Sequence, residues 1–130
     1  MRDLIDAALA ARKMAHAPYS KFYVGAAMRD EQGRVHAGAN MENAAYPQGW
    51  CAECSAIAQL IMAGGKKITE VAVLGNGDVL CTPCGGCRQK IREFAAGEVK
   101  IHCCTESGKL LQTFTLEELL PASFGPEHLK

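Results

Sequence analysis

The sequence lacks an excess of charge of either sign, because 14 Lys and Arg residues balance 14 Asp and Glu residues. A protein that binds nucleic acid mainly through phosphate contacts needs surplus positive charge, which this composition does not supply. Aromatic residues are also few, at 6%, so a groove of aromatic side chains for stacking single-stranded bases is not expected. We therefore expect no nucleic-acid partner.

Long apolar runs are missing as well. No run reaches the roughly 18 residues of a membrane span. The opening segment carries Asp3 and Asp6 where a secretory signal peptide has an unbroken apolar stretch. We expect no membrane partner and a cytoplasmic location. The 130 residues contain 48% hydrophobic residues and no repeat or linker, which predicts a single domain over residues 1–130.

Cysteine, by contrast, is abundant, with seven residues in the chain. An odd number cannot all pair within one chain, and the density is below that of disulfide-rich mini-proteins. Four of them form two C-x-x-C pairs, Cys51/Cys54 and Cys84/Cys87, with 29 residues between the pairs. Two such pairs in a reducing compartment indicate a zinc site. A structural Cys₄ zinc module is one possibility, although its gap is typically only about 15–20 residues.

The residues around the cysteines favour a catalytic site instead. Glu53 follows Cys51 by two positions, and Pro83 precedes the second pair. A carboxylate two residues after a ligand, followed later by P-C-x-x-C, is typical of zinc deaminases of nucleobases, in which the Glu acts as acid and base. Three protein ligands leave a fourth zinc position for water. Cys51 and Cys84 each precede an expected helix, whose positive N-terminal end favours thiolate.

Hydrophobic periodicity and turn residues predict one mixed sheet with helices on both faces. Helices are expected over 3–15, 51–63 and 85–96, and a short helix is expected between a Thr115/Glu118 capping box and Pro121. Strands are expected over 21–29, 34–39, 70–75, 99–104 and 109–114, with a loop over 40–50.

Five groups of residues, in this order, make the chain resemble the cytidine deaminases, specifically the small homotetrameric zinc (Cys₃) type. They are YSKF with VGAA (19–22, 24–27), GANMENAAYP (38–47), CAE (51–53), PCGGCRQ (83–89), and LLP with FGP (119–121, 124–126). The resemblance implies a three-layer α/β/α fold around a five-stranded mixed β-sheet. It also implies hydrolytic deamination of cytidine and 2′-deoxycytidine in pyrimidine salvage. A related deaminase of a modified cytosine nucleoside, such as blasticidin S, is the alternative.

The same resemblance assigns the site residues. It implies one Zn²⁺ per subunit with Cys51, Cys84 and Cys87 as ligands and Glu53 as the proton shuttle. The expected substrate-binding residues are Phe22 beside the pyrimidine, Asn40 and Glu42 on the ribose hydroxyls, and Tyr46 and Phe124 at the site of a neighbouring subunit in a homotetramer.

One residue departs from the family pattern. The position after Glu53 is commonly Arg in Cys₃ members, where it offsets the ligand charge, but here it is Cys54. Three thiolates and one zinc ion carry a net charge of about −1, and helix N-termini are the evident compensation. Three roles are open for Cys54: a neutral thiol that donates a weak hydrogen bond to a ligand sulfur, a packed apolar residue, or a fourth ligand.

Overall fold

The computed structural model describes residues 1–129, which contain a five-stranded sheet with the order β2-β1-β3-β4-β5. The strands are β1 (Gly25–Asp30), β2 (Val35–Ala39), β3 (Ile68–Leu74), β4 (Lys100–Cys104) and β5 (Leu110–Thr115). Strands β3 and β4 run parallel, and all other neighbours are antiparallel. The expected mixed sheet is confirmed.

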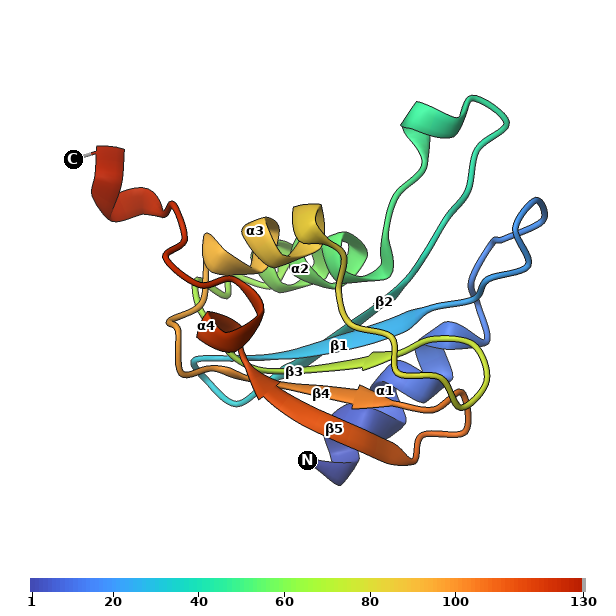
Figure 1. Cartoon of the computed structure of the whole chain (residues 1–130), viewed down its shortest axis with the longest axis horizontal. Coiled ribbons are helices and arrows are strands. Elements are labelled where there is room, and N and C mark those ends of the chain that lie inside the picture. Colours follow the sequence, from blue (N-terminus) through green and yellow to red (C-terminus); the bar gives the residue numbers. More distant parts are fainter. Residues whose placement is uncertain (130) are drawn as a thin grey trace.

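Helices cover both faces of the sheet (Figure 1). Helix α1 (Arg2–Arg12) packs on one face, whereas α2 (Ala52–Met62) and α3 (Gly85–Arg92) lie on the other. Side chains alternate along β3: Ala72 and Leu74 pack with α1, and Val71 and Val73 pack with α2 and α3. The three-layer α/β/α fold is confirmed. None of the helices within residues 1–129 is long and apolar enough to cross a bilayer.

Two predicted elements extend four residues beyond the observed ones at one end. Strand β1 begins at Gly25, not at residue 21, because the backbone N–H groups of Tyr23 and Val24 donate to the side chains of Asn76 and Asn40. Helix α3 ends at Arg92 because the Phe94 carbonyl accepts a hydrogen bond from Ile68 at the start of β3. In both places a contact with a distant segment sets the boundary of the element.

The helices lie very close to the sheet at two glycines. A Cβ atom on Gly38 of β2 would lie 2.5 Å from the Ala56 nitrogen of α2, and one on Gly25 would lie 2.1 Å from the Ala8 oxygen of α1. No side chain fits at either position. These contacts set the distance of α1 and α2 from the sheet.

The chain between β2 and α2 projects from the body of the fold (Figure 1). It contains the 3₁₀ turn Tyr46–Gln48, and paired backbone hydrogen bonds between Met41 and Trp50 close its base. After β5, the short helix α4 (Leu116–Leu119) begins at the predicted capping box, in which the Thr115 side chain accepts from the Glu118 N–H. The 3₁₀ turn Pro126–Leu129 follows.

Candidate active site

The candidate site lies where the first turns of α2 and α3 come together. Cys51 is the N-cap of α2 and Cys84 is the N-cap of α3, as their positions in the sequence predict. The N–H groups in the first turn of each helix have no partner within the helix, and together with the helix dipoles they place partial positive charge around the cysteine sulfurs. The fold therefore favours thiolate at this point.

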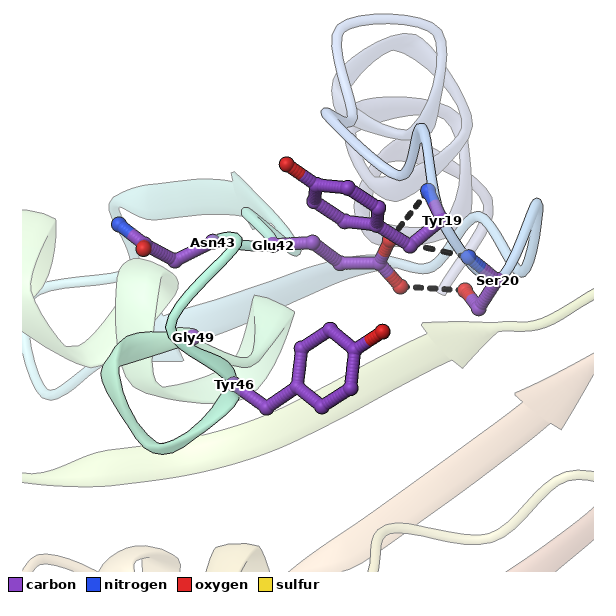
Figure 2. A pocket seen from close by; sticks show the side chains of 6 residues that line it. All are labelled: Tyr19, Ser20, Glu42, Asn43, Tyr46 and Gly49. Atoms are coloured by element: carbon purple, nitrogen blue, oxygen red, sulfur yellow. Dashed lines mark hydrogen bonds between the residues drawn. The ribbon is translucent and has the colours of Figure 1, made fainter.

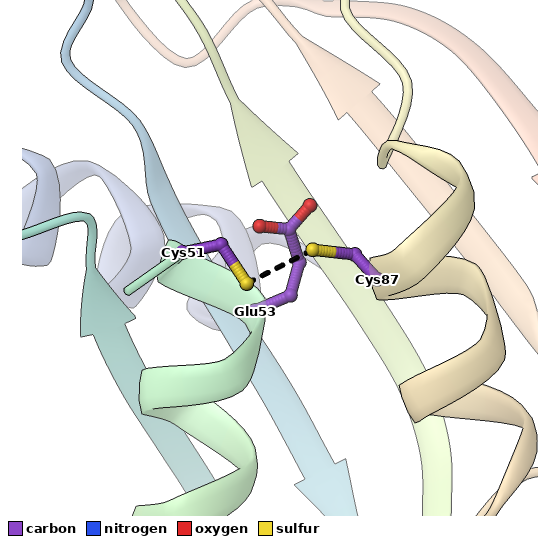
Figure 3. A group of neighbouring side chains, drawn as sticks. All are labelled: Cys51, Glu53 and Cys87. Atoms are coloured by element: carbon purple, nitrogen blue, oxygen red, sulfur yellow. Dashed lines mark hydrogen bonds between the residues drawn. The ribbon is translucent and has the colours of Figure 1, made fainter. Parts of the chain in front are cut away.

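Two predicted zinc ligands and the predicted proton shuttle meet in the space between these helices (Figure 3). The ligand atoms of Cys51, Glu53 and Cys87 all lie within 4.8 Å of one another, and the Cys87 thiol donates to the Cys51 sulfur over 2.9 Å. Cys84 lies outside this group but lines the same cavity, and it is exposed. Sulfur donors at two helix ends suit zinc. Cys51, Cys84 and Cys87 stay the predicted ligands.

The pKa values of these groups are strongly shifted. The hydrogen bond from Cys87 lowers the pKa of Cys51 to about 6, against an opposing effect of burial. Burial, followed by the nearby Cys51 charge, raises the pKa of Glu53 to about 7. Glu53 is only 5% exposed. A buried carboxyl with a pKa near neutrality is suited to both accepting and releasing a proton.

Cys54 lies in the first turn of α2, half-buried and outside the converging group. Burial raises its pKa, and the neighbouring Cys51 charge and hydrogen bonding act in the same direction. The three roles expected for Cys54, as a donor, a packed residue or a fourth ligand, stay predictions.

A cavity of about 420 Å³ opens beside the cysteines. Its walls include four of the five predicted substrate-binding residues together with all predicted catalytic and ligand residues: Phe22, Asn40, Glu42, Tyr46, Cys51, Glu53, Cys84 and Cys87. This volume is in the range of pockets that enclose small organic ligands. The resemblance thus assigns roles to residues that the fold brings to one cavity.

Asn40 and Glu42 are both held by the segment that precedes β1. The Asn40 amide accepts from the Val24 N–H (2.9 Å) and donates to the Phe22 carbonyl (2.8 Å), which positions the backbone that carries the Phe22 ring. The Glu42 carboxylate accepts from the Tyr19 N–H (3.0 Å) and from the N–H and hydroxyl of Ser20 (Figure 2). The Ser20 hydrogen bonds lower the pKa of Glu42, so it stays an ionised acceptor.

Tyr46 joins this cavity to a second one of about 380 Å³. Glu42, Tyr46 and Gly49 line both cavities, and the Tyr46 ring meets the Tyr19 ring edge-on at 6.0 Å (Figure 2). The Tyr46 side chain is 76% exposed. The projecting loop therefore extends the cavity outward, and the single chain leaves this end open to solvent.

Phe124 is the predicted site residue that the single chain does not bring to the cavity. It is 55% exposed, stacks on His128 at 5.1 Å, and is absent from the lining of both cavities described here. Gln89 of α3 donates to its carbonyl over 2.9 Å. The tail is thus anchored to the helix that carries Cys87, while the Phe124 ring is exposed and lines neither cavity.

Three residues without an assigned role in the sequence also belong to this region. Cys81 and Thr82 line the larger cavity, and the Lys90 ammonium lies 5.7 Å from the centre of the Trp50 ring. The spacing of Cys81, three residues before Cys84, is the only signal for it in the sequence. The position of Lys90 depends on how α3 packs beside the loop before Cys51, which no local pattern reveals.

Comparisons with known proteins agree with this geometry. Residues 1–103 match the family model described as the cytidine and deoxycytidylate deaminase zinc-binding region. The chain is 38% identical over 129 residues to the cytidine deaminase of Sporosarcina psychrophila. The aligned region covers 99% of this chain and 94% of the relative. The crystal structure of cytidine deaminase from Burkholderia pseudomallei superposes with a TM-score of 0.86 at 37% identity, over 94% of this chain and 97% of that one. The Mycobacterium leprae cytidine deaminase structure gives a TM-score of 0.78 at 41% identity, over 92% and 95%.

Proposed function

Because the chain belongs to the cytidine and deoxycytidylate deaminase family, we propose that it hydrolyses cytidine and 2′-deoxycytidine to uridine and 2′-deoxyuridine. Water supplies the oxygen that replaces the amino group at C4, and ammonia leaves. The observation that carries this proposal is the buried Glu53 beside the Cys51 and Cys87 sulfurs, in a cavity large enough for a nucleoside.

Cys51, Cys84 and Cys87 are proposed to hold zinc, which supplies the acidification that makes a water molecule nucleophilic at neutral pH. Glu53 takes the proton of that water and delivers it to ring N3, which makes C4 more electrophilic. Glu53 then takes the proton of the new C4 hydroxyl group and passes it to the amino group, which leaves as ammonia when the C4–N bond breaks. Its raised pKa supports this double role, because a carboxyl with a pKa of about 7 exchanges protons readily near neutral pH.

The remaining walls of the cavity select a nucleoside. The Phe22 ring packs against the pyrimidine, and Asn40 and Glu42 face the ribose hydroxyls. Ser20 and Tyr19 use three hydrogen bonds to hold the Glu42 carboxylate. A carboxylate has about four acceptor positions, so capacity remains for a sugar hydroxyl. A free base lacks this partner and leaves polar groups of the site unsatisfied, which penalises its binding.

The proposal extends to the assembly and the cellular setting. One Zn²⁺ per subunit, a homotetramer completed by Tyr46 and Phe124 of neighbouring subunits, a cytoplasmic location and a role in pyrimidine salvage all follow from the family resemblance. The open outer end of the cavity and the exposed Phe124 support the shared site. The seven unpaired cysteines support a reducing compartment.

Replacing Glu53 tests the proposal. In Glu53→Gln we expect an intact zinc content and a fall in cytidine turnover of about 10⁴-fold, the upper end for general acid–base catalysis, because one carboxyl serves several proton transfers. The assay follows the loss of cytidine absorbance, with zinc quantified in the same sample and blasticidin S, cytosine and adenosine as alternative substrates. Zinc without cytidine turnover in the wild type would indicate a structural zinc module, unchanged turnover in Glu53→Gln would contradict the role given to Glu53, and preferential turnover of blasticidin S would identify the alternative substrate.

A further inference from the structure

The proposed zinc site carries an unbalanced negative charge. Three thiolates around one dication leave a net charge of about −1, and helix N-termini offer only partial charges in return. The residue after Glu53 is Cys54, and the first turn of α2 contains no Lys or Arg, so α2 itself supplies no cation there. The structure places a cation beside the site from a different element.

Lys90 of α3 occupies that position. It follows Cys87 by three residues and therefore lies on the same face of the helix, one turn further along. Its ammonium lies 5.7 Å from the centre of the Trp50 ring, and Trp50 directly precedes Cys51. A cation at this distance from a Trp ring is within the range of a cation–π contact. Lys90 thus spans the gap between the two elements that carry Cys51 and Cys87.

The ammonium has no competing carboxylate partner among residues 1–129, where no Asp or Glu oxygen lies within 4 Å of it. The pKa of Lys90 is raised, chiefly by the nearby Cys51 charge and to a smaller extent by the other cysteines of the two pairs, against an opposing effect of burial. Its electrostatic partners are therefore the site's own acidic groups.

Arg88, a second cation on α3, forms hydrogen bonds with other groups. The Arg88 guanidinium donates to the carbonyls of Pro83 and Leu119, each over 2.7 Å, and to the Thr82 hydroxyl over 2.8 Å. These contacts tie the loop before Cys84 to the end of α4. Arg88 is thereby fixed on the loop and the tail, Arg92 bonds Ser123 and Glu127, and Lys90 is the cation of α3 that contacts the residue before Cys51.

We propose that Lys90, held against Trp50, is a positioning residue for the metal site, where it offsets the excess charge of the zinc–thiolate group and so strengthens zinc binding. This inference rests on the proposed zinc site. Lys90 touches neither the substrate nor the reacting atoms. It acts through the Cys51 and Cys87 sulfurs and takes over the charge compensation that Cys54 does not provide.

The test measures zinc affinity in the full-length protein, by competition with a chromophoric chelator at low and at high salt. Lys90→Met keeps the length of the side chain and removes its charge, whereas Lys90→Arg keeps the charge. Lys66→Met is the matched control, because Lys66 is an exposed lysine beyond the opposite end of α2 from Cys51. Thermal unfolding of each variant checks that the fold is retained.

We expect Lys90→Met to bind zinc about tenfold more weakly at low salt, as is typical for loss of a group that supports metal ligands. The difference should shrink at high salt, because screening weakens a charge near the surface. Lys90→Arg and Lys66→Met should match the wild type. The inference is wrong if Lys90→Met binds zinc like the wild type, if Lys90→Arg is equally weakened, or if salt leaves the difference unchanged. A wild-type protein that binds no zinc would overturn the proposed site, and this inference with it.

Discussion

At the scale of single residues, Asp30 shows how a buried charge stabilises the fold away from the site. Its side chain is buried at the end of β1, where it accepts from the backbone N–H groups of Gln32 and Arg34. The Arg34 guanidinium and the His36 ring also bond it, at 2.8 and 2.9 Å. Burial acts to raise the pKa of Asp30, but these hydrogen bonds outweigh it and hold the pKa below its ordinary value.

The sign of that shift predicts a pH-dependent effect of Asp30→Asn. A lowered pKa means that folding favours the ionised form, so the stabilisation is complete above the unfolded-state pKa of about 4 and is lost as the pH falls below it. We expect Asp30→Asn to lower the urea midpoint clearly at about pH 7 and progressively less below about pH 4. Asp78→Asn, at an exposed position, is the control. A difference in urea midpoint between the wild type and Asp30→Asn that grows as the pH falls would contradict the lowered pKa of Asp30.

Cys54 permits a second prediction at this scale. If its thiol is a donor to a ligand sulfur, Cys54→Ser keeps a donor of similar size, and the protein should retain one zinc ion and wild-type stability. A Cys₄ site would instead lose a ligand and, with it, metal affinity. Zinc content by atomic absorption, together with thermal unfolding, distinguishes the two. Zinc loss in Cys54→Ser alongside an unaffected Cys84→Ser would make Cys54 the ligand.

At the scale of elements, the two helices behind the site have different tasks. Helix α2 is fixed by its close contact with β2 at Gly38, which determines where its N-cap Cys51 lies. Helix α3 carries Cys87 and Lys90 on the side of the site. It also anchors the C-terminal segment, since Gln89 donates to the Phe124 carbonyl and Arg92 to the Ser123 hydroxyl. One short helix thus connects the metal ligands to the tail.

The contact at Gly38 makes substitution there destabilising. In Gly38→Ala the added methyl would overlap the α2 backbone, which must shift away from the sheet. We expect a loss of about 1–3 kcal/mol in the free energy of unfolding, as is usual for overpacking, and weaker zinc binding because Cys51 moves with α2. Gly86→Ala on α3 is the control, since no atom lies within 4 Å of its added Cβ. Urea unfolding measures the stability of the two variants, and equal stabilities of Gly38→Ala and Gly86→Ala would refute the packing argument.

At the scale of the whole molecule, the proposed assembly makes each site depend on two chains. Phe124 is exposed and lines neither cavity of its own chain, whereas Glu53 is buried in the wall of the larger one. A homotetramer, with a mass of about four times the 13.9 kDa chain, would bring the Phe124 ring of one subunit to the cavity of another. Sedimentation equilibrium measures this mass directly.

Mixing two inactive variants tests whether the site is shared. Glu53→Gln lacks the proton shuttle, and Phe124→Ala lacks the ring that a neighbour is proposed to supply. When the two are refolded together in equal amounts, random assembly pairs an intact Glu53 with a neighbour's intact Phe124 in about a quarter of the sites of a symmetric oligomer. We expect activity to recover to about that fraction of wild type. No recovery, with both variants tetrameric, would place Phe124 outside the neighbouring site.

The sequence by itself determined the elements and the chemistry of the site. Helix and strand periodicities, the Thr115/Glu118 capping box and the cysteine spacings depend on neighbours only a few residues apart, so they are visible in the linear chain. They predicted the mixed sheet with helices on both faces, which is confirmed, and placed Cys51 and Cys84 at the starts of helices. The order of the motifs likewise identified the family that the comparisons support.

Only the tertiary structure decided how distant segments complete the site. It placed Lys90 beside Trp50, tied Glu42 to Ser20, and began β1 at Gly25 because side chains from elsewhere bond the residues before it. Such contacts join residues that are far apart in the chain, and they exist only once the sheet and helices have packed. Their absence from any local pattern is the physical reason that the sequence predicts the ligands of this site but not the cation beside them.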